Sequence, residues 1–488
     1  FSSDIGSFTV LTDSKIIINK NSLIEFINNG WISGKKTIYD DIEKVMPGEL
    51  LEVYFSKENQ LIIEKRRYWN LNSGINSNNL NFSFEKQVDY LNSLLINVIE
   101  QQLYCERDKA IFFSGGIDST LIAAISKKEL GENITCITCG FGEELQSKSF
   151  DETLFAKDIC ANLEIPHITR NISSKDIVSN LSQMSSIFSE PFADISQVGT
   201  YLISKKAREL GIIVALGGDG GDELFGGYER YLSGPKFLRF KDISPFFIIN
   251  YFYKTLNLMP DLITNGLGKF TRIDNIKQKT EKFFFNYSAI NNIQDLYLSC
   301  LSKWDQNAFE KLGLGKYKCD FIESFIPDNK DIKNEARSFM MKMDLQSFLI
   351  DDVLVKTDRS SMSVGLEARS PFLNHIIVDF ANSIPTYTKF SQTRGKEHLR
   401  KLLKKYIDEK LINRPKKGFS IPIDQILRSS GKEWASEMIN YLKNTNEFSL
   451  NIELIDNLWN EHLKGKRNHG NCLWNLIVLS SWMQVWRK

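Results

Sequence analysis

The sequence predicts an α/β fold in which a parallel sheet carries helices on both faces. From residue 84 onward, segments with helical periodicity alternate with short apolar runs that are typical of strands. Two of these runs, at 110–113 and 212–218, end in glycine-rich turns. Ligands of parallel α/β sheets bind at the carboxyl ends of the strands, so we expect both turns at one edge of the sheet.

The alternating elements follow one another in a regular order. They are expected as helix 84–103, strand 110–113, helix 119–130, strand 133–141, helix 151–165, strand 166–172, helices through 210 and strand 212–218. The segment 233–340 is aromatic and lysine-rich, with helical patches and no chemistry that we can assign. Helices are expected to dominate from 341 to 488.

The N-terminal region has a different pattern. Residues 1–69 contain short alternating segments of β type, such as 14–20 and 49–55. An Asn- and Ser-rich stretch with the composition of a linker follows at 70–83. We therefore expect a domain boundary there, which divides the chain into 1–75 and 76–488. Because the first residue is Phe rather than Met, we also expect that the chain begins partway through a longer protein.

The amino-acid composition of the chain excludes some classes of protein function. The chain has 488 residues, 42% hydrophobic and 25% charged, which is enough to bury large cores in two domains. Lys and Arg number 61 against 60 Asp and Glu, so net charge gives no reason to expect nucleic acid. No apolar run approaches the roughly 20 residues that a membrane span needs.

The seven cysteines are scattered without a regular framework, which indicates reduced thiols and a cytoplasmic setting. Cys136 and Cys139 form a C-x-x-C motif, but it lies in an expected strand and lacks the second pair of a structural zinc site. We expect buried core thiols there.

The first glycine-rich turn has the properties of an anion cradle. Ser114, Gly115 and Gly116 follow a strand and lead into a helix. Glycine permits close approach and positive φ, and the helix start offers free N–H groups with a positive dipole end. A polyphosphate is the simplest ligand. The pattern is neither the G-x-G-x-x-G turn nor the G-x-x-x-x-G-K-[ST] loop.

A second loop of the same kind carries acidic residues. Asp219, Asp222 and Glu223 lie among glycines in the segment 214–231, and Asp118 lies just after the first turn. If both loops share one edge of the sheet, Asp118 and Asp222 can hold a magnesium ion that bridges phosphate oxygens. The alternative is a glycine-rich turn whose acids only cap helices.

These motifs resemble those of a known family. "FSGGIDST" is similar to the pyrophosphate loop of the N-type ATP pyrophosphatases, whose fold is adenine-nucleotide α-hydrolase-like. "GGDGGDELFGGYERY", "EPFADISQ" and "DRSSMSVGLEARSPFLNH" resemble segments of the glutamine-hydrolysing asparagine synthetases. The resemblance implies that a substrate carboxylate attacks ATP to give an acyl-adenylate and pyrophosphate, and that ammonia then displaces AMP.

The resemblance also assigns residues to the nucleotide. It implies pyrophosphate binding by Ser114, Gly115, Gly116 and Ser119, magnesium binding by Asp118 and Asp222, and contact with adenosine by Phe113, Cys139, Gly217 and Gly218. Gly217 stands where relatives often carry Ser, which removes a hydroxyl near the nucleotide.

Three further assignments concern the reaction and the acceptor. Asp219 occupies a position implicated in the adenylate step, and Lys416 matches a lysine that steadies charge on the transferring phosphoryl group. Lys417 is the rival for that role, and a solvated loop lysine is the alternative for Lys416. Arg359, Glu367 and Arg369 either orient an acidic substrate or form a buried salt-bridge network.

The N-terminal part resembles the end of the family's glutaminase domain, an α+β N-terminal-nucleophile fold. That fold uses an N-terminal cysteine to attack glutamine, whereas the first cysteine here is Cys105. Either the segment with the nucleophile precedes residue 1, as Phe1 suggests, or the chain uses free ammonia.

We therefore expect a ligase that uses ATP and Mg²⁺ to amidate a carboxylate, with glutamine or ammonia as nitrogen donor. Aspartate leads as acceptor, ahead of a sugar uronate of surface polysaccharides or the closure of a β-lactam ring. A non-catalytic nucleotide-binding relative is a second class. The expected partners are these small molecules, and a homodimer is one open arrangement.

Overall fold

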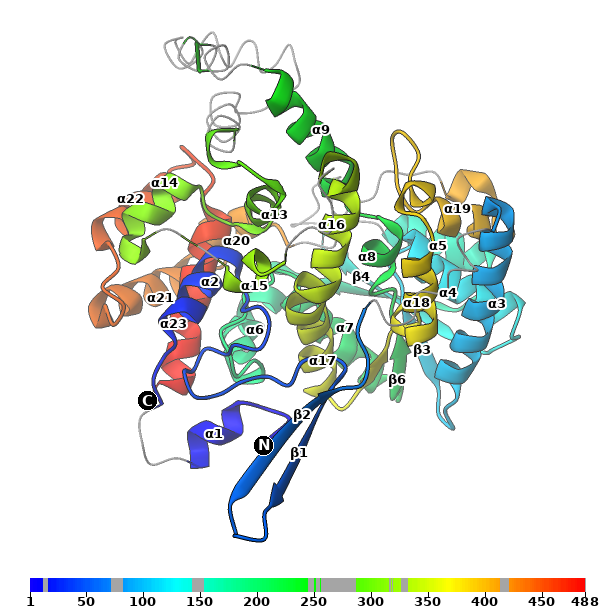
Figure 1. Ribbon diagram of the computed structural model, residues 1–488, viewed down its shortest axis with the longest axis horizontal. Coiled ribbons are helices and arrows are strands. Elements are labelled where there is room, and N and C mark those ends of the chain that lie inside the picture. Colours follow the sequence, from blue (N-terminus) through cyan, green and yellow to red (C-terminus); the bar gives the residue numbers. More distant parts are fainter. Residues whose placement is uncertain are drawn as a thin grey trace.

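The computed structural model describes residues 1–11, 16–71, 82–142, 153–244, 250–251, 255, 287–315, 317, 319–325, 332–412 and 421–487. Within these ranges the central feature is a five-stranded sheet in the order β5-β4-β3-β6-β7, and every pairing in it is parallel (Figure 1). The strands are β3 (Lys109–Phe112), β4 (Thr135–Phe141), β5 (His167–Ile172), β6 (Val214–Leu216) and β7 (Glu367–Arg369). The predicted α/β fold is confirmed.

Helices cover both faces of this sheet, as predicted. Alternate side chains of β3 enter two different cores, because successive residues of a strand point to opposite faces. Ile111 packs in a core with the helices α3 (Phe84–Leu103), α4 (Ile117–Lys128) and α5 (Thr153–Asn162). Its neighbour Ala110 packs in a second core with residues of α7 (Gln197–Glu209).

The sheet order places the two glycine-rich turns next to each other. β3 lies between β4 and β6, and Ile111 of β3 is in register with Leu216 of β6. Both strands run in the same direction, so the turns at 114 and 217 leave the same edge at neighbouring positions.

The short strand β7 was not predicted. It lies in the region where helices were expected to dominate, and it is three residues long. It joins the sheet by pairing with β6, with Ala215 opposite Ala368. A strand of this length has no visible alternation, so only its place beside β6 reveals it.

The expectation of β-type segments in the N-terminal region is partly wrong. β1 (Glu49–Phe55) and β2 (Leu61–Arg67) form an antiparallel hairpin. Within the described part of the expected segment 14–20, which is residues 16–20, the structure has an isolated bridge between Ile18 and Tyr39, and α2 (Lys20–Asn29) begins at its end. Asn19 caps α2 by accepting a hydrogen bond from the Ser22 amide, and the apolar side chains then follow at helical spacing.

The helix α2 is buried against the C-terminal helices (Figure 1). Phe26 and Ile27 share a core with residues of α23 (Gly470–Trp486). The Asn475 side-chain amide and the Trp304 indole N–H donate to the carbonyl oxygen of Ile27, at 2.9 and 2.8 Å. The N-terminal segment is therefore part of the same core as the end of the chain. The predicted boundary at residue 75 stays a prediction.

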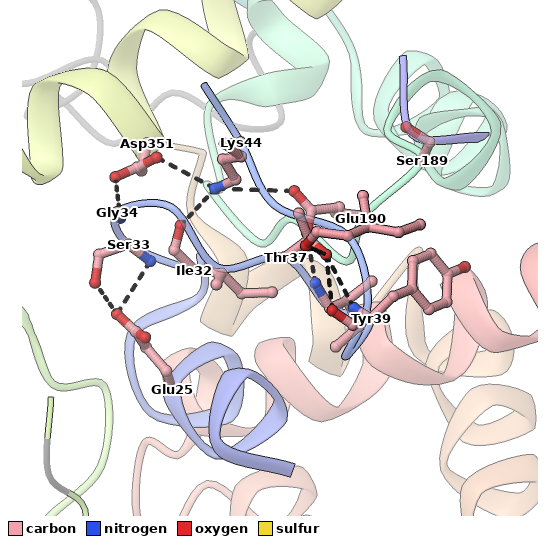
Figure 2. Close-up of polar contacts among 12 residues, drawn as sticks. Glu25, Ile32, Ser33, Gly34, Thr37, Tyr39, Lys44, Ser189, Glu190 and Asp351 are labelled. Atoms are coloured by element: carbon pink, nitrogen blue, oxygen red, sulfur yellow. Dashed lines mark hydrogen bonds and ion pairs between the residues drawn. The ribbon is translucent and has the colours of Figure 1, made fainter. Parts of the chain in front are cut away.

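A polar network holds the loop after α2 in place, and Figure 2 shows Lys44 at its centre. The Lys44 ammonium lies 3.2 Å from a carboxylate oxygen of Asp351, 3.9 Å from one of Glu190 and 2.9 Å from the carbonyl oxygen of Ile32. Asp351 also accepts from the Gly34 amide at 2.9 Å. Burial alone lowers the pKa of Lys44, but Asp351 and Glu190 raise it above its ordinary value.

The β1–β2 hairpin projects from the body of the molecule (Figure 1). Its apolar side chains Val53, Phe55, Leu61 and Ile63 are exposed. The hairpin thus contributes little to the cores described above.

The described part of the chain contains further α-helices. They are α1 (Gly6–Leu11), α6 (Ser174–Ile187), α8 (Gly221–Phe225), α9 (Arg230–Ile243), α13 (Ile293–Leu301), α14 (Gln306–Phe309), α15 (Asp320–Glu323), α16 (Ile332–Gln346), α17 (Val355–Met362), α18 (His375–Ser383), α19 (Glu397–Leu403), α20 (Ile423–Arg428), α21 (Lys432–Thr445) and α22 (Ile452–Leu463). Among the described helices, none combines the length and the apolar character needed to cross a bilayer.

Candidate active site

The loop between β3 and α4 is built as an open cradle. Gly115 has φ +66°, and a Cβ there would lie 3.3 Å from the Cα of Ala156, so glycine is required for both reasons. The Gly116 amide donates to the Ser114 hydroxyl at 3.1 Å, and the Ser114 amide donates to the Ser119 hydroxyl at 3.3 Å. Gly116 is the N-cap of α4 and makes no side-chain cap, which leaves this helix end suited to an anion.

The loop after β6 touches the first turn of α4. A Cβ at Gly218 would lie 2.9 Å from the Cβ of Asp118 and 3.2 Å from the Ser119 amide nitrogen. A Cβ at Gly221 would lie 2.5 Å from a carboxylate oxygen of Asp118. Only glycine permits this approach. The prediction that the two loops meet at one edge of the sheet is confirmed.

A lysine from a third segment joins the two loops. The Lys396 ammonium forms ion pairs with Asp118 and with Asp222, the latter at 2.7 Å, and the side chain is 4% exposed. Lys396 has φ +62° and immediately precedes α19. Burial alone would lower its pKa, but Asp118 and Asp222 raise it to about 12. The lysine is therefore charged at neutral pH.

The residues fit a magnesium ion that arrives with a phosphorylated substrate. Asp118 and Asp222 contact the same ammonium nitrogen, so their oxygens converge on one position for a cation. Mg²⁺ commonly takes one or two protein carboxylates and completes its shell with phosphate oxygens and water. In the described part of the chain there is no group of three or more His, Cys, Asp or Glu side chains arranged for a metal, so nothing there forms an all-protein cage.

Asp219 lies in the same loop as Asp222, three residues before it, and its side chain is partly buried. Its carboxylate accepts a hydrogen bond from the Thr357 hydroxyl at 3.2 Å. Burial raises the pKa of Asp219, the charges of Asp118 and Asp222 add to the rise, and Lys356 opposes it. A carboxyl with a raised pKa at the edge of a phosphate cradle is suited to proton transfer.

Lys356 extends the site away from the phosphate cradle. Its ammonium is paired with Asp194 at 2.8 Å, and each of the two side chains is 16% exposed. Burial alone lowers the pKa of Lys356, but Asp194, Asp352 and Asp219 raise it. Lys356 was not singled out in the sequence, although its i,i+4 spacing from Asp352 on a helical segment was a usable signal.

The residues assigned to adenosine lie close to the cradle. Phe113 is buried, follows β3, and meets the His167 ring edge to face with centroids 6.5 Å apart. Cys139 is half-buried in β4, opposite Arg170 of β5. Cys136 is buried beside Cys160, whose hydrogen bond together with burial raises its pKa, so it is a core thiol as expected.

The two lysines and the two arginines that the sequence suggested for the reaction and the acceptor are not found at the phosphate cradle in the part of the chain that the structure describes. Lys416 and Lys417 lie outside the described residues. Arg359 and Arg369 make salt bridges, the former with Asp4 at 2.8 Å and the latter with Glu367 at 2.9 Å. Both arginines are therefore engaged in salt bridges, but these are two separate and partly exposed pairs rather than the buried network that was the alternative.

A parallel sheet that brings an anion cradle and a carboxylate-rich loop to one edge defines an α/β protein of the class that binds phosphorylated ligands. A comparison with protein families identifies the family within this class. The family described as asparagine synthase matches residues 90–486. The chain therefore belongs to the asparagine synthase family, which is a family of enzymes.

Curated relatives agree with this assignment at modest identity. "Asparagine synthetase [glutamine-hydrolyzing] 1" of Bacillus subtilis is 24% identical over 99% of this chain, which spans 72% of that relative. "Putative asparagine synthetase [glutamine-hydrolyzing]" of Mycobacterium bovis is 26% identical over 82% of this chain, which spans 58% of it. The solved structure of NMN synthetase from Francisella tularensis, with 19% identity, overlaps 30% of this chain and 59% of that one at a TM-score of 0.21.

Proposed function

We propose that this chain catalyses ATP-dependent amide synthesis. A substrate carboxylate attacks the α-phosphorus of ATP and releases pyrophosphate, and ammonia then displaces AMP from the acyl-adenylate to form the amide. One observation carries the proposal: Asp118 and Asp222, from two loops about a hundred residues apart, meet over a glycine cradle around the buried Lys396. Membership of the asparagine synthase family supports it.

The chain's own residues can offset the electrostatic repulsion that opposes this reaction. A carboxylate and a triphosphate repel each other, so negative charge must be neutralised as the reacting groups meet. In the proposal, Ser114, Gly115, Gly116 and Ser119 bind the pyrophosphate part of ATP through the cradle and the amino end of α4. Phe113, Cys139, Gly217 and Gly218 line the adenosine end. Lys396 then adds a fixed positive charge beside the phosphates.

Asp118 and Asp222 would hold the magnesium ion that accompanies ATP. When bound, the ion neutralises phosphate charge and polarises the phosphoryl oxygens. Asp219 is proposed to act in the adenylate step. When ammonia then attacks the acyl-adenylate, the Asp219 carboxylate takes up the proton that the ammonia nitrogen releases, and a raised pKa makes it a stronger base for this transfer. Lys416 is proposed to steady charge on the transferring phosphoryl group.

Aspartate is the proposed acceptor, with glutamine or ammonia as the nitrogen donor. The names of the curated relatives support this choice. A sugar uronate is the alternative acceptor, and a nucleotide-binding relative without catalysis is the alternative class.

The experiment incubates the chain with ATP, Mg²⁺, ammonium chloride and L-aspartate, and measures AMP, pyrophosphate and asparagine. We expect equal amounts of the three products from wild type, and at least a roughly 100-fold lower rate from Asp118→Ala. The exposed Asp358→Asn on α17 is the matched control and should keep the wild-type rate. ATP binding without AMP formation from any acceptor would overturn the ligase proposal in favour of a non-catalytic protein.

A further inference from the structure

A short chain of hydrogen bonds ends at the carbonyl group that immediately precedes the phosphate cradle, and it has no role in the chemistry above. Thr138 lies in the interior of β4 and is 2% exposed. Its hydroxyl donates to the carbonyl oxygen of Phe113 at 2.6 Å, across 25 positions of the chain. The same Oγ1 atom lies 2.7 Å from Nε2 of His167 in β5. One threonine hydroxyl thus links the end of β3 to β4 and β5.

The direction of each hydrogen bond in this chain follows from the chemistry of its groups. A carbonyl oxygen only accepts, so the single hydroxyl proton of Thr138 is committed to Phe113. The Thr138 oxygen must then accept from His167, which requires a proton on Nε2 of that ring. Burial lowers the pKa of His167, and the charge of Lys157 lowers it further, so the imidazole is neutral at neutral pH and its Nδ1 atom carries no proton.

This hydrogen-bond chain is one of three contacts that fix Phe113. The aromatic rings of His167 and Phe113 meet edge to face with centroids 6.5 Å apart. The Phe113 amide donates to the carbonyl oxygen of Ile137 at 2.9 Å, and the Phe113 carbonyl accepts from Thr138. Ser114 follows directly and begins the cradle. Phe113 is therefore held at its amide, its carbonyl and its ring at the point where the chain leaves the sheet.

The position of this contact favours a role in nucleotide binding. Thr138 directly precedes Cys139, and Phe113 and Cys139 are two of the residues proposed to line the adenosine end. A hydrogen bond between the ends of β3 and β4 at these residues sets the distance between the adenosine end and the phosphate cradle. Valine has nearly the shape of threonine but no hydroxyl, so it would take this donor away from the Phe113 carbonyl.

We propose that Thr138 and His167 are positioning residues for ATP: His167 orients the Thr138 hydroxyl, which holds the Phe113 carbonyl and thereby the start of the phosphate cradle. In this role neither side chain needs to touch the reacting atoms. The inference rests on the proposed function, because the ligand that is positioned is the ATP of that reaction.

The test measures ATP binding apart from turnover. Calorimetry gives the Kd of a non-hydrolysable ATP analogue with Mg²⁺, and AMP formation gives kcat and KM for ATP. We expect Thr138→Val and His167→Phe each to raise Kd and KM about 10-fold, while kcat changes less than about 2-fold, because binding of ATP and of the transition state weaken together. Thr138→Ser keeps the hydroxyl, and His167→Gln offers an amide donor in place of Nε2, so both should stay within about 3-fold of wild type.

The matched control is Thr169→Val, which makes the same substitution in the neighbouring strand. Thr169 lies in β5 in register with Thr138, and its side chain is exposed. This variant should bind the analogue as wild type does.

A second measurement does not depend on ATP. In protein labelled with nitrogen-15 histidine, the His167 ring signals are identified by their loss in His167→Phe. At neutral pH they should be those of the Nε2–H tautomer, and Thr138→Val should shift them. A ring protonated on Nδ1 instead would reverse the chain of hydrogen bonds and overturn the inference.

The outcomes separate this inference from the proposed function. If Thr138→Val binds the analogue as tightly as wild type, the ligase stays intact and the inference is overturned. Lower stability or kcat in Thr138→Val, with Kd and KM for ATP unchanged, would show a structural role alone and also overturn it. Equal losses in Thr138→Ser or Thr169→Val would show that the hydroxyl is not the cause. If wild type does not bind the analogue, the proposed function and the inference are overturned together.

Discussion

At the residue scale, the site depends on a few charges that are buried in pairs. Lys396 is the strongest case, because it joins Asp118 and Asp222 while being almost fully excluded from water. A lysine in this position offsets the mutual repulsion of two carboxylates. It also places one positive charge at the edge of the phosphate cradle.

We predict that Lys396→Met abolishes most ATP-dependent AMP formation, with a loss of at least about 100-fold, since a fixed charge beside the phosphates is removed. The measurement is the rate of AMP release under saturating ATP. Lys401→Met, on the helix that Lys396 precedes, is the control, because Lys401 is exposed and pairs with Glu85 at the surface. Equal losses in both variants would contradict the role of Lys396.

A second residue-scale prediction concerns pH. The carboxyl of Asp352 has a folded pKa of about 8, raised by burial and Asp194 and opposed by Lys356, Lys303 and Arg230. Stability from this neutral acid is fully present below about pH 4 and is lost as pH rises toward 8, because only the unfolded chain ionises in that interval.

Without ligand, wild type should therefore lose about 2.7 kcal/mol more unfolding free energy than Asp352→Asn between pH 5 and pH 7, at about 1.36 kcal/mol for each pH unit. Urea unfolding at the two pH values measures the difference. An unchanged difference would show that the carboxyl is ionised in the folded protein.

The close approach of the two loops gives a third prediction. Gly218→Ala places a methyl group 2.9 Å from the Cβ of Asp118, which must push the loops apart. We expect a loss of about 1–3 kcal/mol in unfolding free energy and at least a roughly 10-fold loss of AMP formation. Gly142→Ala is the control, since its nearest neighbour atom would be 3.6 Å away.

At the element scale, the N-terminal helix α2 and the loop after it are joined to the rest of the chain by buried polar contacts. Lys44 pairs with Asp351, which directly precedes Asp352, and with Glu190, which lies four residues before Asp194. The loop thus contacts the two segments that supply Asp194 and Asp352. Docking of the N-terminal segment and the placing of these two acids are therefore coupled.

We predict that Lys44→Met lowers the unfolding free energy by about 3–5 kcal/mol, because it leaves the Asp351 carboxylate buried without its cation. The double variant Lys44→Met with Asp351→Asn should recover a large part of this loss. Urea unfolding of the single and double variants measures the coupling. Strictly additive effects would show that the pair does not act as a unit.

At the scale of the whole molecule, the sheet order decides where ligand binding can stabilise the protein. The proposed ATP site joins β3, β6, α4 and the start of α19, so occupancy should tie these elements together. We predict that a non-hydrolysable ATP analogue with Mg²⁺, at about 100 times its Kd, stabilises the protein by about 2.7 kcal/mol. Thermal unfolding measures this, and Asp118→Ala or removal of Mg²⁺ by EDTA should abolish most of the rise in midpoint.

Local pattern was enough to predict most of the sheet and its helices. Strands β3 to β6 and helices α3 to α5 lie where alternation of apolar runs and helical periodicity placed them. Helix α2 was not predicted, because the whole region 1–69 was interpreted as short β-type segments, and β7 is too short to show a period. Packing against the C-terminal helices and against β6 decided these two elements.

The sequence by itself determined the two glycine loops and the carboxylates Asp118 and Asp222, because a turn, a helix start and a strand end are encoded by neighbouring residues. Only the tertiary structure decided that Lys396 pairs with both carboxylates and that Lys356 pairs with Asp194. The physical reason is that a buried charge takes its partner from whichever element packs against it, and those elements are up to 278 positions apart in the chain.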